Sequence, residues 1–543
     1  MTGTGNNGVF AGVLAPIGVN NVMTLSPDGR SIVYGADTED GKAYQLWLRL
    51  LDSEVAKPLR GTVSPFQGAF WSPDGKWIGF FADKKLKRID VATETVQTLA
   101  DAPTPRGGTW NRDGTILFSP AGNGILYRMP AAGGQPEPVT QLLAEEVTHR
   151  FPQFLPDGRH FLFWISGTPQ VEGTYAGALD SHEHHKICVA DGPAIFAPPA
   201  QLFFVRESVL YGQRFDPDTM KLSGEPIPVA SGVSTSPYTL LRFTASRNGT
   251  IAYRPDVIVR RQMTWLDRSG NTLGTVGESI DDLQNAELSP DGRTLGLTIQ
   301  RGTGRYSMSL MDMARGTVTP LGTGWSGAPR WSPDGSKIAF GCVPRGILDV
   351  CWTTVSSNGP GEMLYVSPEA KNMNDWSPDG KYILFSPQTP KTSRDVIAVP
   401  VTGNDRQPIR VAQTPAEEKS GRFSPDGKWV AYVSDETGRD EVFVRPFPGP
   451  GPAVRVSTGG GENPFWRKDA KEIYYILGDQ VLAALVKSSA SGAFEVGIPA
   501  PLFKAKGIAV VRTDGQRFLF SMTLNDVSTP PITVIMNWAG LEK

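Results

Sequence analysis

WSPDGKWIGFF, residues 71–81, carries the pattern that decides the fold. Pro73 has a φ of about −65°, which suits the second position of a type I turn, and Asp74 is a short acceptor for nearby backbone N–H groups. Gly75 supplies the positive φ that a bulge closing a three-residue hairpin requires. The residues that follow alternate in direction along the chain, as in a β-strand. The stretch therefore predicts a strand, a tight turn and a second strand.

The same phrase recurs along the chain. Close copies are LSPDGRSIVYG from 25, LSPDGRTLGLT from 288, WSPDGSKIAFG from 331, WSPDGKYILFS from 376 and FSPDGKWVAYV from 423. Weaker copies are NRDG at 111, LPDG at 155, SRNG at 246, RKDA at 467 and RTDG at 512. The Asp or Asn of successive copies lies 39 to 47 residues after the previous one, except for one interval of 91 residues.

The long interval spans two periods, so a unit without the signature is expected near residue 201, where AQLFFVRESVLYGQRFD still alternates. This makes twelve units over the whole chain. A period of about 40–45 residues with several strands per unit is typical of propeller blades. Residues 423–458 contain four short strand-like segments, the number in one blade. The sequence predicts an all-β protein of twelve four-stranded blades.

Twelve blades can form one large ring or two rings of six. Propellers usually have four to eight blades, which favours two six-bladed propellers in tandem. We place the first propeller at residues 1–270 and the second at 271–543. The N-terminal strand at 8–18 is expected to close the unit formed by LLRFTAS, TIAYRP and QMTWLDR. The strand at 272–277 is expected to close the last unit, formed by IAVVRT, QRFLFSM and ITVIMNW.

Composition excludes some classes of function. The chain has 543 residues, 53 Lys and Arg against 55 Asp and Glu, and a net charge of −2, so no bulk charge attracts nucleic acid. No apolar run approaches the length of a membrane span. The N-terminus lacks the features of a signal peptide, which predicts a cytoplasmic protein if the chain is complete, or a segment cut from a longer chain.

Three cysteines exclude a framework of several disulfides. Cys342 and Cys351 flank a tight turn and can face each other across two strands of one blade. A bond between them would indicate an oxidising compartment. Two reduced, small apolar side chains are an equally good interpretation.

The repeated aromatic-SPDG unit with its alternating strand resembles the PD40 or TolB-like (WD40-like) propeller repeat. Longer stretches, among them 85–120, 149–164 and 530–543, resemble the C-terminal propeller region of acidobacterial-type receptor-like serine/threonine kinases. That resemblance implies a sensor region that follows a kinase and a membrane helix, and an extracytoplasmic or periplasmic location. The chain has no Gly-rich loop with a VAIK-type strand and no HRD or DFG, so kinase activity is not implied.

DSHEHHK, residues 180–186, is the most unusual stretch for chemistry. Imidazole and carboxylate groups are ligands for zinc, copper or nickel. The stretch is expected in a turn between TYAGAL and KICVA at the outer edge of the fourth blade, where a solvated polar turn is the favoured interpretation. His182, His184 and His185 are therefore weak metal candidates, and no metal or other cofactor is predicted.

The loops that lead into the first strand of each blade open around the propeller axis, where a ligand would bind. His149 is the strongest candidate for a titrating group there. The polar residues expected at this channel mouth are Gln67, Arg106, His149 and Arg150 in the first ring, and Asn285, Arg330, Asn374, Lys419, Arg422, Glu462 and Asn463 in the second. Their mixed charge suits a peptide, a saccharide or a protein loop.

The sequence favours a non-enzymatic module that binds or senses a ligand or a protein. The first alternative is a propeller lyase or hydrolase acting on a saccharide or lactone through a channel-mouth histidine or a metal. The second is a structural scaffold, which would show a sizeable exposed apolar patch. A serine hydrolase is rejected because GWSGA at 324–328 lacks the last glycine of the nucleophile elbow. No catalytic residue is predicted.

Overall fold

Each Ser-Pro-Asp-Gly turn is held by the same hydrogen bonds in the computed structural model of the protein. Ser72 Oγ donates to Asp74 Oδ1 at 2.6 Å and accepts from Trp77 N at 2.9 Å. Gly75 has a φ of 71° and donates its N–H to the Ser72 carbonyl at 3.0 Å. The Ser72 hydroxyl is the main reason that the pKa of Asp74 is lowered, against the opposing effect of burial. The predicted turn chemistry is confirmed, and the aspartate acts as a turn acceptor.

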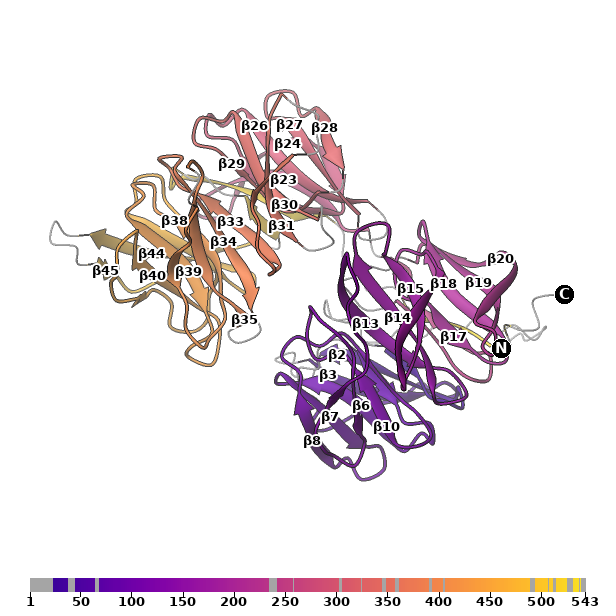
Figure 1. Ribbon diagram of the computed structural model, residues 1–543. Helices are drawn as coiled ribbons and strands as arrows, with labels where there is room; N and C mark the ends of the chain where they lie inside the picture. Colours follow the sequence, from indigo (N-terminus) through magenta and orange to yellow (C-terminus); the bar gives the residue numbers. More distant parts are fainter. Residues whose placement is uncertain are drawn as a thin grey trace. The chain divides into compact units, whose positions relative to one another are not determined.

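The structure describes residues 23–37, 44–63, 68–233, 242–256, 258–301, 305–323, 325–343, 348–356, 361–389, 393–403, 406–488, 494–505, 507–510, 514–524, 531–536 and 538. These residues form antiparallel strands and contain no α-helix. No helix in the described ranges is long and apolar enough to span a membrane. The chain divides into two compact units, seen in Figure 1 as two groups of sheets.

Unit 1 contains six sheets, five of four strands and one of three described strands. In order from the innermost strand outward, they are β1 (Met23–Leu25), β2 (Ser31–Asp37), β3 (Tyr44–Leu50) and β4 (Ala56–Pro58); β5 (Ala69–Trp71), β6 (Trp77–Ala82), β7 (Lys85–Asp90) and β8 (Val96–Asp101); β9 (Gly108–Trp110), β10 (Thr115–Phe118), β11 (Tyr127–Pro130) and β12 (Glu137–Pro138); β13 (Glu146–Phe154), β14 (His160–Gly167), β15 (Gly173–Ala178) and β16 (Ser181–Cys188); β17 (Ile195–Ala197), β18 (Gln201–Arg206), β19 (Val209–Asp216) and β20 (Lys221–Ser231); and β21 (Phe243–Ala245), β22 (Ile251–Tyr253) and β49 (Thr533–Ile535).

Unit 2 also contains six sheets. They are β47 (Gly507–Val510), β48 (Arg517–Thr523), β23 (Arg260–Asp267) and β24 (Thr272–Asp281); β25 (Leu283–Leu288), β26 (Thr294–Arg301), β27 (Arg305–Asp312) and β28 (Val318–Thr323); β29 (Trp325–Trp331), β30 (Lys337–Cys342), β31 (Asp349–Thr354) and β32 (Glu362–Tyr365); β33 (Lys371–Trp376), β34 (Tyr382–Thr389), β35 (Ser393–Arg394), β36 (Val396–Pro400) and β37 (Ile409–Ala412); β38 (Glu418–Phe423), β39 (Trp429–Ser434), β40 (Glu441–Pro446) and β41 (Val454–Arg455); and β42 (Glu462–Trp466), β43 (Glu472–Leu477), β44 (Gln480–Ser488), β45 (Phe494–Val496) and β46 (Ala500–Lys504).

The innermost strands of each unit follow one another in a cycle. In unit 1, β1, β5, β9, β13, β17 and β21 make contact in this order, and β21 returns to β1. In unit 2 the order is β25, β29, β33, β38 and β42, and β47 contacts β25. The sheets of β42 and β47 meet through aromatic packing, with the rings of Tyr474 and Phe518 5.1 Å apart. A cycle of four-stranded sheets is the arrangement of propeller blades.

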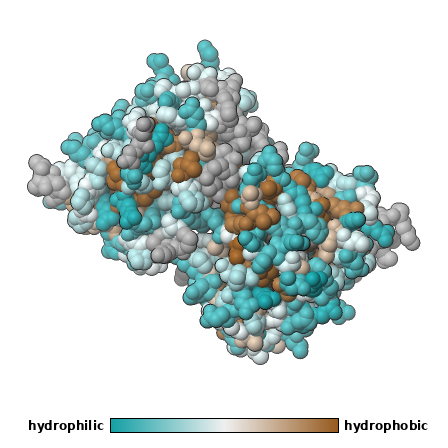
Figure 2. Space-filling view, viewed as in Figure 1, coloured by the Kyte–Doolittle hydropathy of each residue, from teal (hydrophilic) through white to brown (hydrophobic). Residues whose placement is uncertain are grey.

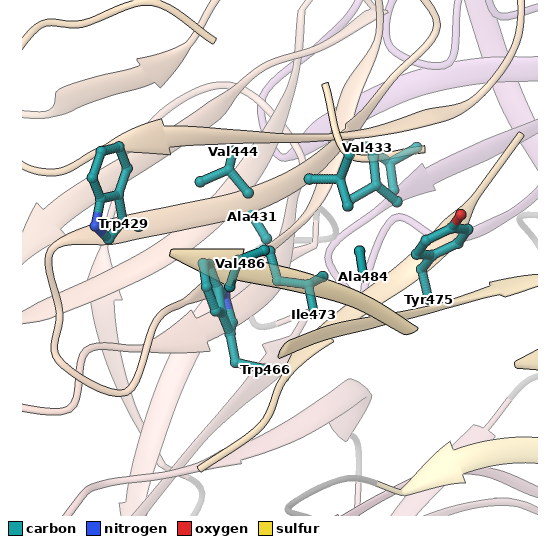
Figure 3. Packing of buried hydrophobic residues seen from close by; sticks show 11 residues of the cluster. Trp429, Ala431, Val433, Val444, Trp466, Ile473, Tyr475, Ala484 and Val486 are labelled. Atoms are coloured by element: carbon teal, nitrogen blue, oxygen red, sulfur yellow. The ribbon is translucent and has the colours of Figure 1, made fainter. Parts of the chain in front are cut away.

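The core lies between neighbouring sheets. Figure 3 shows one such layer, in which Trp429, Ala431 and Val444 face side chains of the next sheet, among them Trp466 and Ile473. A fully buried side chain of this kind contributes about 1.5–3 kcal/mol. Each sheet buries its apolar faces only against its neighbours, so every unit of sequence repeats the same strand pattern.

The predicted division at 270/271 is wrong. The chain passes from unit 1 to unit 2 between Asp256 and Ile258, and the described residues 531–536 and 538 belong to unit 1 again. β23 therefore belongs to unit 2, where it pairs with β48, and β49 pairs with β22 in unit 1. Both segments are short alternating strands, so their sequence pattern alone does not indicate which sheet they complete.

Two other closure predictions have different outcomes. β24, which contains 272–277, is the outer strand of the sheet that holds β47 and β48, as expected for that segment. The proposed N-terminal closing strand at 8–18 lies outside the described residues. The sequence unit expected near residue 201 is present as the sheet of β17 to β20.

A disulfide joins Cys342 at the end of β30 to Cys351 in β31, with a Cα–Cα distance of 5.8 Å. Both residues are buried in the layer between this sheet and its neighbour. Cys188, the third cysteine, is free. The sequence analysis left two alternatives, a disulfide or two reduced cysteines, and the structure contains the disulfide.

Arg268 joins three strands where the chain closes unit 2. Its guanidinium contacts both carboxylate oxygens of Glu472, at 2.6 and 3.0 Å, and donates to the Gly515 carbonyl at 2.9 Å. Tyr474 Oη donates to the same carboxylate at 2.6 Å. Burial favours the neutral form of Glu472, but Arg268, Tyr474 and Arg467 outweigh it and lower the pKa to about 2.

Removal of residues 531–543 should destabilise unit 1 and leave unit 2 folded. The shortened chain loses β49 and Trp538, whose ring packs against Phe203 with centroids 4.8 Å apart. Loss of one buried tryptophan side chain costs about 3–5 kcal/mol. Hydrogen exchange measured strand by strand should show lost protection in β18 and β22. Lost protection in β48 with an unchanged unit 1 would contradict this assignment of the C-terminal strand.

Arg268→Ala should destabilise unit 2 by roughly 3 kcal/mol, because Glu472 would remain buried without its main partner. In the native protein the pKa of Glu472 is depressed, so its stabilising contribution is present above the unfolded value of about 4.3. That contribution is lost as the pH falls toward 2. Urea unfolding between pH 2 and 5 should therefore show a weaker acid dependence in the variant. An equal acid dependence in both proteins would refute the role of this pair.

Candidate ligand-binding site

One position of the repeat places charged side chains around the axis of unit 2. It lies two residues before the serine of each turn, on the innermost strand. Consecutive sheets carry Glu287, Arg330, Asp375 and Arg422 there, so the sign of the charge alternates from sheet to sheet. We call these four residues the charge ring.

The charge ring is partly withdrawn from solvent. Arg330 Nη1 lies 3.2 Å from Glu287 Oε2, and their side chains are 10% and 7% exposed. Arg422 Nη1 lies 3.7 Å from Asp375 Oδ1 and 3.9 Å from Glu287 Oε2. Burial and the neighbouring Arg422 guanidinium together lower the pKa of Arg330 to about 10, against the opposing effect of Glu287 and Asp375. An added anion beside the two arginines would reduce this repulsion.

A cavity of about 250 Å³ is bounded by residues of five innermost strands, which places it on the axis around which these strands are arranged. Its surface is formed mainly by amide, hydroxyl and cationic side chains. The lining residues are Asn285, Arg330, Asn372, Met373, Asn374, Ser386, Arg394, Lys419, Ser420, Arg422 and Asn463. The acidic partners Glu287, Asp375, Glu417 and Asp440 are not part of this surface.

β-Bulges position the lining residues. The pairing of β38 with β39 shifts between Lys419 and Arg422, and that of β42 with β43 shifts between Glu462 and Phe465. Ser420 and Asn463 have φ values of 56° and 50° inside these bulges. A bulge redirects side chains and bends its strand. Here it brings Lys419 and Arg422 to the same cavity.

Unit 1 carries uncharged residues at the equivalent position, among them Thr109, Gln153 and Thr244. Their polar atoms bond to neighbouring innermost strands: Phe154 N donates to Thr109 Oγ1 at 3.2 Å, and Gln153 exchanges two hydrogen bonds with the backbone of Phe196. A cavity of about 360 Å³ also lies among these strands, with many aromatic and proline side chains in its lining. The polar groups at this position in unit 1 bond the innermost strands to one another. We therefore consider unit 2 the better candidate for recognition of a polar ligand.

The predicted site residues fall into three groups. Asn285, Arg330, Asn374, Lys419, Arg422 and Asn463 line the unit 2 cavity, and their role in ligand binding stays a prediction. Glu462 is exposed and does not line the cavity, and Gln67 lies outside the described residues. The sequence analysis did not select Glu287 and Asp375. Both lie two residues before a turn serine, and this spacing is the sequence signal that identifies them.

The predicted channel residues of unit 1 lie elsewhere. Arg106 donates to the Pro105 carbonyl at 2.8 Å, and Arg150 is buried and donates to the Gly122 carbonyl at 2.8 Å. His149 has no exposed surface and packs against Phe163, so it does not line a channel mouth. Burial lowers its pKa to about 4, although Glu146 opposes this shift. The neighbouring blade covers side chains on the face of β13. The alternation of residues along the strand does not indicate this covering.

DSHEHHK does not form a turn, because residues 181–188 are strand β16. His182 and His185 are exposed on this strand. The side chain of His184 is buried and contacts Glu146, which also contacts His149. The expectation of a solvated outer turn is therefore wrong for His184, and the expected distance between this stretch and His149 is wrong as well.

Cyclic sets of antiparallel four-stranded sheets define the chain as a β-propeller protein. No family model matches it. It is similar to the structure of a putative TolB from Agrobacterium tumefaciens (16% identity, 49% of this chain and 99% of that chain, TM-score 0.37). It is also similar to TolB from Acinetobacter baumannii (18% identity, 57% and 82%, TM-score 0.35).

A curated relative is the uncharacterized peptidase YuxL of Bacillus subtilis, which is 27% identical over 139 residues. The match covers 25% of this chain and 20% of the relative. The chain therefore spans only about a fifth of that protein's length.

Ser420→Gly should stabilise unit 2 by about 0.5–1 kcal/mol, because glycine adopts a positive φ without the strain that serine carries. Ser420→Val should destabilise it by about 1–2 kcal/mol, since a β-branched residue is poorly tolerated there. Asn463→Gly is the matched control and should change little, because asparagine tolerates this conformation. Urea midpoints measure all three. Equal stability of the glycine and valine variants would show that the bulge does not require this backbone conformation.

Proposed function

We propose that the chain is a non-enzymatic binding module whose second unit recognises an acidic peptide segment of a partner protein. The observation that supports the proposal most directly is how few close partners the Arg422 guanidinium has. In the described part of the chain its guanidinium makes ion pairs only at 3.7 and 3.9 Å, beyond normal hydrogen-bond length, and it lines the cavity beside buried Arg330. Its donors remain available for a carboxylate.

The other lining residues favour the same kind of ligand. Lys419 and Arg394 add positive charge, and their acidic partners Asp440 and Glu417 lie outside the lining. Arginine and amide side chains recognise carboxylate and backbone groups through paired hydrogen bonds. The described lining contains no aromatic ring on which a sugar could stack. A peptide with acidic side chains therefore fits this cavity better than a saccharide.

The disulfide supports a location outside the reducing cytoplasm, since such bonds persist mainly in oxidising compartments. This agrees with the sensor role that the kinase-region resemblance implies. We propose that the module senses its partner outside the cytoplasm. Hydrophilic residues cover most of the face seen in Figure 2, with hydrophobic residues in smaller groups, which favours local recognition over a broad apolar scaffold contact.

Fluorescence anisotropy with labelled hexaglutamate tests the proposal, with hexaglutamine as the uncharged comparison. The native chain should bind hexaglutamate more tightly, and binding should weaken with salt. Arg422→Gln should lower the affinity by about 10-fold or more, as expected for the loss of a charge-assisted hydrogen bond.

Arg455→Gln is the matched control, because Arg455 lies exposed on the outermost strand β41 and changes the net charge equally. Equal losses in the two variants, or equal affinity for both peptides, would contradict the site. Binding of oligogalacturonate alone, or its cleavage, would instead support the saccharide-acting alternative.

A further inference from the structure

Three potential metal ligands meet in unit 1, away from the cavities described above. Glu146 and His149 lie on the innermost strand β13, and His184 lies on the outermost strand β16 of the same sheet. Glu146 Oε2 is 3.1 Å from His149 Nε2, and Glu146 Oε1 is 2.8 Å from His184 Nε2. The three side chains are 3%, 0% and 2% exposed, and their ligand atoms all lie within 4.8 Å of one another.

The other ring nitrogens have oxygen partners. His184 Nδ1 is 3.3 Å from the His182 carbonyl, which only accepts, so the proton of a neutral His184 belongs on Nδ1. His149 Nδ1 is 2.8 Å from Thr140 Oγ1, which also accepts from Leu126 N at 3.0 Å. The unprotonated Nε2 of His184 then faces a carboxylate oxygen. A proton or a metal cation between two such acceptors satisfies the 2.8 Å contact.

We propose that Glu146, His149 and His184 bind a zinc ion that stabilises the first propeller unit. Two imidazoles and a carboxylate are a common zinc donor set, whereas calcium and magnesium prefer oxygen ligands alone. With metal–ligand distances of about 2.0–2.1 Å, neighbouring ligand atoms of a tetrahedral site are about 3.3 Å apart. The two Glu146 spacings involve different carboxylate oxygens, and the three ligand atoms lie within 4.8 Å of one another, so side-chain shifts of up to about 1.5 Å bring them to this geometry.

The surroundings match those of built metal sites. Ligating histidines usually bond through the second ring nitrogen to an oxygen that fixes their orientation, as Thr140 and the His182 carbonyl do here. The ring of Phe163 lies 4.9 Å from that of His149, and the ring of Tyr175 lies 5.5 Å from that of His184. These three residues supply three of the four ligands of a tetrahedral zinc site, which leaves the fourth to a ligand such as water.

The position of the three ligands indicates a structural role. The ion would connect the first and last strands of one sheet, between which β14 and β15 lie in the sheet order. The supporting Thr140 follows β12 of the neighbouring sheet, so the site also joins two blades. An ion that binds the folded unit alone stabilises it by mass action.

Metal titration of the full chain tests the inference. After removal of metals with EDTA, the native chain should bind one equivalent of Zn²⁺, and Co²⁺ should give the intense visible absorption of tetrahedral coordination. At a free Zn²⁺ concentration of about one hundred times the Kd, the melting temperature of unit 1 should rise by roughly 5–10 °C. His184→Gln keeps an N–H group for Glu146 but removes the imidazole, and should lower the affinity by more than about 100-fold.

His185→Gln is the matched control, because His185 is an exposed histidine on the same strand. It should keep both the Zn²⁺ stoichiometry and the Co²⁺ spectrum. Unchanged affinity in His184→Gln, or loss only in His185→Gln, would show that surface histidines bind the metal and would overturn the inference. If His184→Gln does not fold, the native Co²⁺ spectrum decides, since a weak octahedral spectrum would exclude this donor set.

Discussion

The bond between a turn serine and the aspartate two residues later is the interaction on which the rest of the structure depends. Ser72 and Asp74 show it, and five other turns repeat it. It positions the serine oxygen to accept the N–H of the second strand, and the following glycine closes the turn. Because the turn sets the register of the first two strands, it also decides which side chains face the axis and which pack against the next blade.

Closure of the two units requires long-range strand pairing. β49 completes a sheet of unit 1 beside β22, and β23 joins β48 in unit 2, although these partners are separated by more than 200 residues. In unit 2 the first and last strands of the unit are thereby joined by hydrogen bonds as well as by side-chain packing. Arg268 and Glu472 add a partly buried ion pair at the closing sheet of unit 2. The exchange makes the stability of unit 1 depend on the last residues of the chain.

The same repeated backbone supports different chemistry at equivalent positions. Two residues before the turn serine, unit 1 uses threonine and glutamine to join its innermost strands, and unit 2 uses the alternating charges of the charge ring. The proposed peptide site and the proposed zinc site both arise where regular pairing is interrupted or where strand ends come together. The peptide site depends on bulges in β38 and β42, and the zinc site on side chains of β13 and β16 that meet over the sheet.

The sequence by itself determined the repeat, the turn chemistry, the all-β class and six residues of the unit 2 cavity, because each depends on local spacing from the turn. It did not determine the exchange of β23 and β49, since any short alternating strand can complete a sheet. It also separated His149 from His184, which the structure joins through Glu146. That contact spans four strands of one sheet, and only the tertiary structure decides which side chains meet at such a distance along the chain.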